Sequence, residues 1–247
     1  MKLPTIEGTI RRRLLLNYRV DPAVVSRELP PPFRPKLHHG HAIAGVCLIR
    51  LEAIRPLGMP RAMGFSSENA AHRIAVVWDT AQGPQEGVFI PRRDTNSIIS
   101  QLAGGRVFPG EHHAASFEVT DVGNDISLSM AATDGSVAVR VSASAATVLP
   151  QDSCFSSVKE ASSFFEPFLL GYSVTSNASS LHGVVLRTKS WHVEPLVVHE
   201  VYSSYFSDQS RFPTGAVSFD HGLIMRNIEH EWHGTDDLHP DRGATSP

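Results

Sequence analysis

The chain has 247 residues, 41% of them apolar, with 22 basic and 25 acidic side chains. This near-neutral balance leaves no electrostatic footprint for a polyanion, so we expect no nucleic-acid partner. No apolar run approaches the roughly 20 residues of a membrane-spanning helix, and the first residues lack the basic-then-apolar order of a signal peptide. We therefore expect no membrane association and a cytoplasmic location. We also expect one domain over residues 1–232, followed by a polar, disordered tail over residues 233–247.

Short β-rich runs recur between turn signals, a spacing typical of a sandwich or barrel. Turn pairs at residues 124–125 and 134–135 predict a meander over residues 115–148. Residues 171–181, rich in Ser, Asn and Thr, are interpreted as a loop. The predicted strands are residues 12–18, 42–51, 74–78, 87–90, 115–119, 126–131, 136–143, 184–193 and 196–205.

Three short helices are predicted. Asp21 is placed as the cap and Pro22 as the first residue of a helix that runs through Glu28. The prolines at residues 30–32 end it. Two further helices are expected over residues 95–102 and 157–165.

The most unusual stretch is residues 104–113, with the sequence GGRVFPGEHH, where glycines and a proline bracket titratable side chains. Adjacent histidines and a glutamate beside a sharp turn can supply a general acid and base near neutral pH. The alternative is a solvated turn followed by a strand that buries one histidine. We expect Glu111 and His112 to point inward.

Two further groups are candidate site residues. Glu68 lies among small residues before an apolar strand, which leaves room for a ligand; the alternative is a carboxylate that is on the surface or paired with a nearby arginine such as Arg73. In the run of residues 11–13, alternation places Arg11 and Arg13 on one face and Arg12 on the other. An inward arginine is costly unless it meets a carboxylate or an anionic ligand. A basic edge that blocks strand aggregation is the alternative.

The sequence predicts no metal and no cofactor. The 13 histidines form close groups at residues 38–41, 192–194 and 230–233, and none has a specific zinc spacing. There is no phosphate-binding loop, no nucleophile elbow and no dinucleotide fingerprint. Cys47 and Cys154 are too few for a disulfide framework and are expected to be buried thiols.

Taken in order, these motifs resemble the acetoacetate decarboxylase-like superfamily, from about Arg11 to Trp232. The resemblance implies a mainly β fold, an antiparallel β-cone or barrel with a few short helices and a closed pocket, and a homo-oligomer. The matching segments are NYRVD at residues 17–21, the proline-bounded residues 29–33, Glu68, GVFIP at residues 87–91, residues 105–113 and FDH at residues 219–221.

The resemblance also implies site residues, with one departure. The family's pocket holds an arginine, a glutamate and a lysine pair whose first member forms a Schiff base. By order, Arg11 matches the arginine and Glu68 the glutamate, and Arg106 lies in the matching Gly-Arg turn. Residues 111–113, Glu-His-His, stand in place of the lysines. Since neither glutamate nor histidine can form a Schiff base, classical acetoacetate decarboxylation is not expected.

What remains is a candidate set for non-covalent acid/base chemistry. Arg11 and Arg106 would bind substrate, and the candidate catalytic residues are Glu68, Glu111, His112 and His113. This set suits enolisation, aldol or dehydration chemistry, or cyclisation of a keto acid or polyketide-like substrate carrying a carboxylate or carbonyl group. The alternatives are a binding protein that keeps the pocket without catalysis, and a structural protein with no enclosed cavity.

Overall fold

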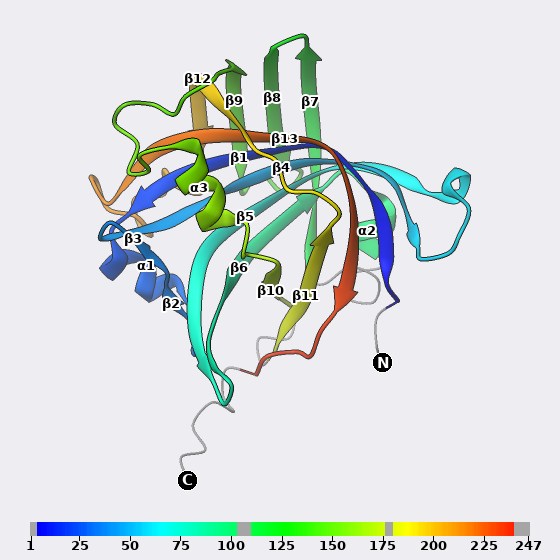
Figure 1. The fold of residues 1–247 in the computed structure, drawn as a ribbon, viewed down its shortest axis with the longest axis horizontal. Helices are drawn as coiled ribbons and strands as arrows, with labels where there is room; N and C mark the ends of the chain where they lie inside the picture. Colours follow the sequence, from blue (N-terminus) through cyan, green and yellow to red (C-terminus); the bar gives the residue numbers. More distant parts are fainter. Residues whose placement is uncertain (1–3, 103–109, 176–179, 240–247) are drawn as a thin grey trace.

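The computed structural model describes residues 4–102, 110–175 and 180–239 (Figure 1). Its strands form one 13-stranded sheet, accompanied by short helices. The strands are β1 (Ile6–Val20), β2 (Arg34–Pro35), β3 (Leu37–His38), β4 (His41–Pro56), β5 (Phe65–Thr80), β6 (Gly83–Thr95), β7 (His112–Val122), β8 (Asp125–Ala132), β9 (Ala138–Ala145), β10 (Leu170–Val174), β11 (Leu181–Thr188), β12 (Glu194–Ser203) and β13 (Val217–Gly234). The helices are α1 (Pro22–Glu28), the 3₁₀ helix η1 (Arg61–Met63), α2 (Ile98–Leu102) and α3 (Val158–Phe165).

Part of the sheet closes on itself. The strands pair in the order β1, β4, β5, β6, β10, β11 and β13, and β13 returns to β1. We call these strands the ring. A second layer leaves the ring at β6, runs through β7, β8, β9 and β12, and rejoins it at β13. The fold is the mainly β architecture that the resemblance implies, although β6 pairs in parallel with both β7 and β10.

The ring separates two apolar cores, because successive side chains of a strand point to opposite faces. In β1, Leu14 and Leu16 belong to the core that faces the second layer, whereas Leu15 belongs to the other. Helix α3 buries Phe164 and Phe165 in the core that contains Leu15. Strand β1 is therefore apolar on both faces, which explains the unbroken leucine run.

Most predicted elements are confirmed, with shifted boundaries: several strands are longer than predicted, whereas α2 begins only at Ile98 and β11 ends at Thr188. Helix α1 begins at Pro22, and the Asp21 side chain accepts a hydrogen bond from the Ala23 N–H at 2.8 Å. The meander is confirmed as β7, β8 and β9. The loop expected over residues 171–181 is wrong in part, because β10 pairs there with β6 and β11. The prediction also missed β13, the longest strand.

The ordered chain continues past residue 232. Strand β13 ends at Gly234, and Leu238 pairs with Leu181 through an isolated bridge. The expected domain boundary is therefore too early.

Both cysteines are free thiols, Cys47 buried and Cys154 half-buried. Within the described segments, no helix is both long and apolar enough to cross a membrane.

Candidate functional site

A cavity of about 60 Å³ lies among the strands of the ring, beside the start of β7. Such a largely apolar space with a few convergent polar groups is typical of small-molecule sites. The apolar wall includes Ile49, Leu51, Ile54, Phe65, Val184 and Trp232. The polar lining residues are Ser67, Asn69, Arg93, Asp94, Ser100 and His112.

Arg93 is the only arginine or lysine among these lining residues. Its Nε donates to Ser173 Oγ at 2.9 Å, and no carboxylate of the described segments forms an ion pair with it. Burial lowers the pKa of Arg93 to about 10, which leaves the guanidinium charged at neutral pH. Arg93 is half-buried, and a cation held there without a counter-ion is costly, so an anionic ligand would offset that cost.

His112 lies directly across from Arg93, because the two residues pair between parallel strands β6 and β7. Its Nδ1 is 3.3 Å from the Gly110 carbonyl oxygen, which favours the neutral tautomer with hydrogen on Nδ1. Burial, and secondarily the charge of Arg93, lower the pKa of His112 from 6.5 to about 3. The imidazole is therefore neutral at pH 7.

Gly110 sets the direction in which the chain enters β7. Its φ is 86°, in the left-handed region, and a Cβ at this position would lie 2.5 Å from the Cβ of Ser173. A larger residue would push β7 away from β10. The position of His112 therefore depends on this glycine.

The other polar groups of the cavity are fixed by their neighbours. Asp94 is fully buried and accepts three hydrogen bonds from Arg92, at 2.7, 2.9 and 3.1 Å. Burial raises the pKa of Asp94, and the Arg92 pair opposes that effect. The Asn69 amide donates to Ser67 Oγ at 2.9 Å and accepts from Thr95 Oγ1 at 2.8 Å. These groups need little rearrangement to meet a ligand.

The inward arginine of β1 is Arg12 rather than Arg11. A register shift between Ile10 and Arg12 in the β1–β4 pairing leaves Arg11 exposed, where it donates to Asn227. Arg12 is 4% exposed, and its Nη2 lies 2.6 Å from Glu68 Oε2. Burial raises the pKa of Glu68 in spite of this pair. Neither Arg11 nor Glu68 lines the cavity, so the expected meeting of the two does not occur.

The Glu111-His112-His113 segment divides between surface and interior. Only His112 lines the cavity. Glu111 is exposed, and His113 points to a separate surface depression that it shares with Arg211. The expectation that Glu111 and His112 both point inward therefore holds for His112 alone. Arg106 lies outside the described residues.

Sequence reasoning missed Arg93, Asn69 and Asp94. The signal was available in the Arg-Arg-Asp run at the end of the GVFIP strand, because alternation must turn one of two adjacent arginines inward. Asp94 forms an ion pair with Arg92, so Arg93 is the arginine of this run whose side chain lines the cavity.

A family model matches residues 7–211 of the chain and describes DUF2071, an uncharacterized conserved protein (COG2071). The chain belongs to the DUF2071 family. No curated protein sequence matches this DUF2071 protein significantly.

Solved structures share the fold of this DUF2071 protein at low sequence identity. An acetoacetate decarboxylase-like enzyme from Sphingomonas wittichii RW1 aligns with a TM-score of 0.59 and 14% identity, over 96% of this chain and 93% of that one. Acetoacetate decarboxylase from Legionella pneumophila subsp. pneumophila str. Philadelphia 1 aligns with a TM-score of 0.59 and 13% identity, over 96% of this chain and 89% of that one. The enduracididine biosynthesis enzyme MppR, complexed with pyruvate, aligns with a TM-score of 0.57 and 11% identity, over 97% of this chain and 91% of that one. The fold is therefore acetoacetate decarboxylase-like.

Proposed function

We propose that this protein binds a small keto acid in the cavity and acts on it by non-covalent acid/base chemistry. The observation that carries the proposal is the pairing of Arg93 with His112: a charged guanidinium without a carboxylate partner among the described residues shares one cavity with a neutral imidazole. The complex of the structural neighbour MppR with pyruvate supports the substrate class.

Each polar group then has a defined task. The Arg93 guanidinium holds the substrate carboxylate through charge-assisted hydrogen bonds. His112 Nε2 takes a proton from the carbon next to the carbonyl group and returns it, which is enolisation. The same enol can add to a second carbonyl group or lose water, which gives aldol, dehydration or cyclisation chemistry.

The route is non-covalent because no lysine of the described segments lines the cavity. The volume of about 60 Å³ holds roughly five water molecules, since each needs about 10–15 Å³ on this measure. A compact acid such as pyruvate fits this space. A polyketide-like substrate would have to extend beyond it.

The test is hydrogen–deuterium exchange at the methyl group of pyruvate, followed by NMR in D₂O. The wild-type protein is expected to accelerate exchange, and His112→Asn to lower the enzyme-dependent rate by about 10²- to 10⁴-fold while pyruvate still binds. His113→Asn is the matched control, because that side chain lies outside the cavity. Equal loss of exchange in both variants would contradict the role of His112.

A pyruvate-binding measurement distinguishes an enzyme from a non-catalytic binding protein. Saturable pyruvate binding without any exchange, by the wild-type protein, favours a non-catalytic binding protein that uses the same cavity. Absence of both binding and exchange, with pyruvate and with acetoacetate, contradicts the proposed function.

A further inference from the structure

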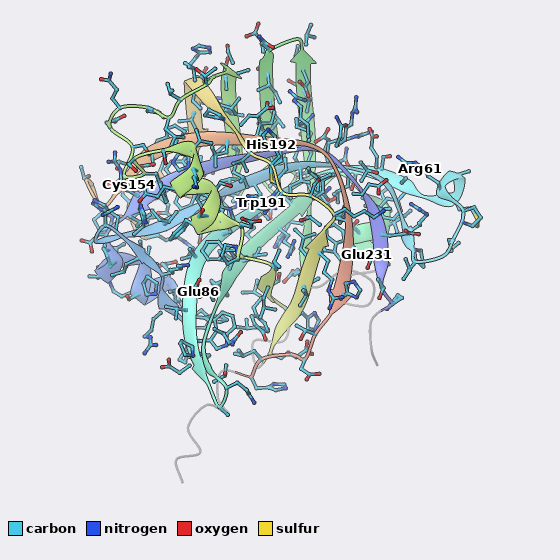
Figure 2. The ribbon with its side chains drawn as sticks, in the orientation of Figure 1. Arg61, Glu86, Cys154, Trp191, His192 and Glu231 are labelled. Atoms are coloured by element: carbon cyan, nitrogen blue, oxygen red, sulfur yellow. The ribbon has the colours of Figure 1, made fainter. Side chains whose placement is uncertain are left out.

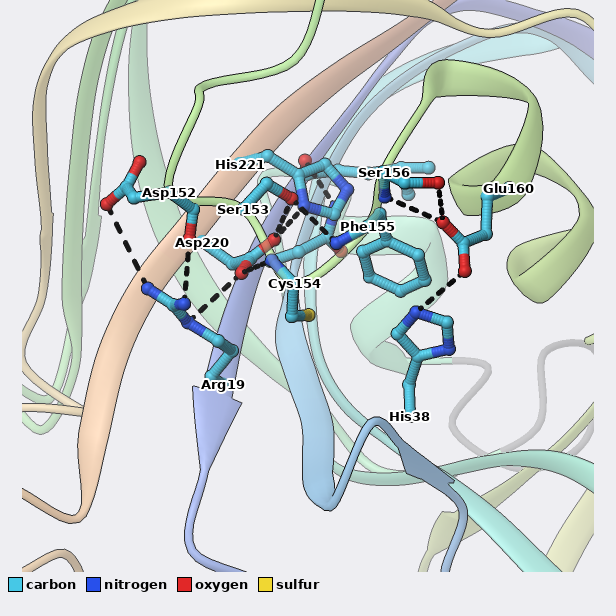
Figure 3. Close-up of polar contacts among 12 residues, drawn as sticks. Arg19, His38, Asp152, Ser153, Cys154, Phe155, Ser156, Glu160, Asp220 and His221 are labelled. Atoms are coloured by element: carbon cyan, nitrogen blue, oxygen red, sulfur yellow. Dashed lines mark hydrogen bonds and ion pairs between the residues drawn. The ribbon is translucent and has the colours of Figure 1, made fainter.

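A second polar cluster lies where the turn between β3 and β4 meets the start of α3. His38 ends β3, His39 lies in the turn that follows, and Glu160 comes from the first turn of the helix. One potential donor atom from each residue lies within 4.8 Å of the other two. Figure 3 shows His38 facing Glu160 across this contact. The helix supplies a ligand far away in sequence, so local histidine spacing gives no sign of the cluster.

The distances suit a shared metal ion. Glu160 Oε1 lies 3.4 Å from His38 Nε2 and 3.3 Å from His39 Nε2. Tetrahedral bonds of about 2.0–2.1 Å to nitrogen and oxygen separate two ligand atoms by about 3.3–3.4 Å. These two pairs therefore have the spacing of a coordinated metal before any side chain moves.

His38 presents a nitrogen that nothing else in the described segments satisfies. Its Nε2 is buried and has no hydrogen-bond partner, although Glu160 Oε1 is near. The ring also stacks on Phe155, with centroids 4.0 Å apart. A buried nitrogen left without a partner is unfavourable, and a metal ion would satisfy it.

The backbone brings both histidines to the same carboxylate. Adjacent side chains of an extended chain point in opposite directions. His39 has a φ of 45°, in the left-handed region, and its ring meets the His38 ring edge-on with centroids 4.3 Å apart. Positive φ values at both His39 and Gly40 are what the two-residue turn between β3 and β4 requires, and this turn places the two imidazole rings on the same side.

The carboxylate is also fixed in place. Glu160 Oε2 accepts hydrogen bonds from the Ser156 N–H at 2.6 Å and from Ser156 Oγ at 2.5 Å. These bonds leave Oε1 directed at the two histidines.

The segment that carries Cys154 and Ser156 is anchored to β13. Asp220 accepts hydrogen bonds from the Cys154 N–H at 2.9 Å and from Ser153 Oγ at 2.7 Å, and it also pairs with His221 (Figure 3). The groups that orient His38 and Glu160 are therefore held by the sheet. This support gives the cluster the rigidity that a metal site needs.

We propose that His38, His39 and Glu160 bind a divalent transition-metal ion such as Zn²⁺. Three protein ligands leave a fourth position for water, on the side where His39 is exposed. The ion would tie the β3–β4 turn to α3. This inference is independent of the function proposed for the cavity.

The experiment is a Zn²⁺ titration of the full-length, chelator-treated protein against a competing chromophoric chelator. One equivalent is expected to bind, and His39→Asn and Glu160→Gln are each expected to weaken binding about 100-fold. The His39 side chain is 65% exposed, so its replacement leaves the fold intact. Co²⁺ provides a second readout: the visible absorption of a four-coordinate site should appear in the wild type and be lost in His39→Asn.

His192→Asn is the matched control. His192 lies on the segment that leads into β12 (Figure 2), with its Nε2 3.5 Å from Glu194 Oε1, but this exposed pair belongs to no three-ligand cluster of the described residues. This variant should bind Zn²⁺ as the wild type does. Absence of stoichiometric binding, or less than 10-fold weakening in either His39→Asn or Glu160→Gln, overturns the proposal.

Discussion

Arg93 and His112 lie directly opposite each other on parallel strands β6 and β7, and both line the cavity. The positive charge of one contributes to keeping the other neutral. An anion bound at Arg93 would remove that contribution. The pair therefore couples ligand binding to the basicity of the candidate catalytic group.

This coupling predicts that pyruvate raises the pKa of His112. Burial still opposes protonation when pyruvate is bound, but the charge of Arg93 is then offset. The measurement is an NMR pH titration of the His112 ring proton with and without saturating pyruvate. In Arg93→Gln, pyruvate should produce no such shift. A pKa that stays constant in the wild type would contradict the coupling.

The buried pair of Arg12 and Glu68 should contribute to stability rather than to ligand binding. Glu68→Gln leaves Arg12 buried without its closest counter-charge, and we expect a loss of about 3 kcal/mol in the free energy of unfolding. Urea denaturation measures this loss.

An exposed ion pair provides the control for that variant. Arg34 Nη2 lies 2.9 Å from Asp79 Oδ2 with both side chains more than half exposed, so Asp79→Asn should change stability by less than about 1 kcal/mol. A similar loss in both variants would show that burial of the Arg12–Glu68 pair does not matter.

His72 should make the fold sensitive to acid. Its ring is fully buried beside Tyr205, neither ring nitrogen has a hydrogen-bond partner in the described segments, and burial lowers its pKa from 6.5 to about 3. Between these two pH values the unfolded chain binds a proton that the folded chain does not, so stability falls as the pH falls from 6.5 towards 3. His72→Phe should shrink the stability difference between pH 7 and pH 5 by about 2 kcal/mol.

Denaturant unfolding at pH 7 and pH 5 tests whether the free energy of unfolding falls as the pH falls. His41→Phe, at an exposed position, should leave the difference unchanged. If the stability of His72→Phe depended on pH as that of the wild-type protein does, groups other than His72 would cause the acid sensitivity.

The strands and helices were largely predictable from sequence because their signals are local. Asp21 and Pro22 begin α1 as their cap and first-turn preferences require. The closure of the ring was not predictable in this way, because β13 pairs with β1 across most of the chain. The loop expected over residues 171–181 failed for the same reason: β10 is stabilised by distant strands, not by its own composition.

The site was only partly predictable, because inward and outward positions depend on register. One irregularity after Ile10 exposes Arg11 and buries Arg12. The Glu-His-His run lies beside the cavity, yet its side chains divide between the cavity and the surface. Glu160 joins His38 and His39 only through tertiary packing, which residue spacing along the chain does not encode.

Calorimetric titration of pyruvate into the wild-type protein, Arg93→Gln and Arg34→Gln tests the central claim most directly. The account predicts saturable binding by the wild type and by Arg34→Gln, whose altered side chain is exposed, and binding weakened about 10- to 100-fold in Arg93→Gln. Equal affinity in Arg93→Gln and the wild type would contradict the assignment of Arg93 as the carboxylate-binding residue.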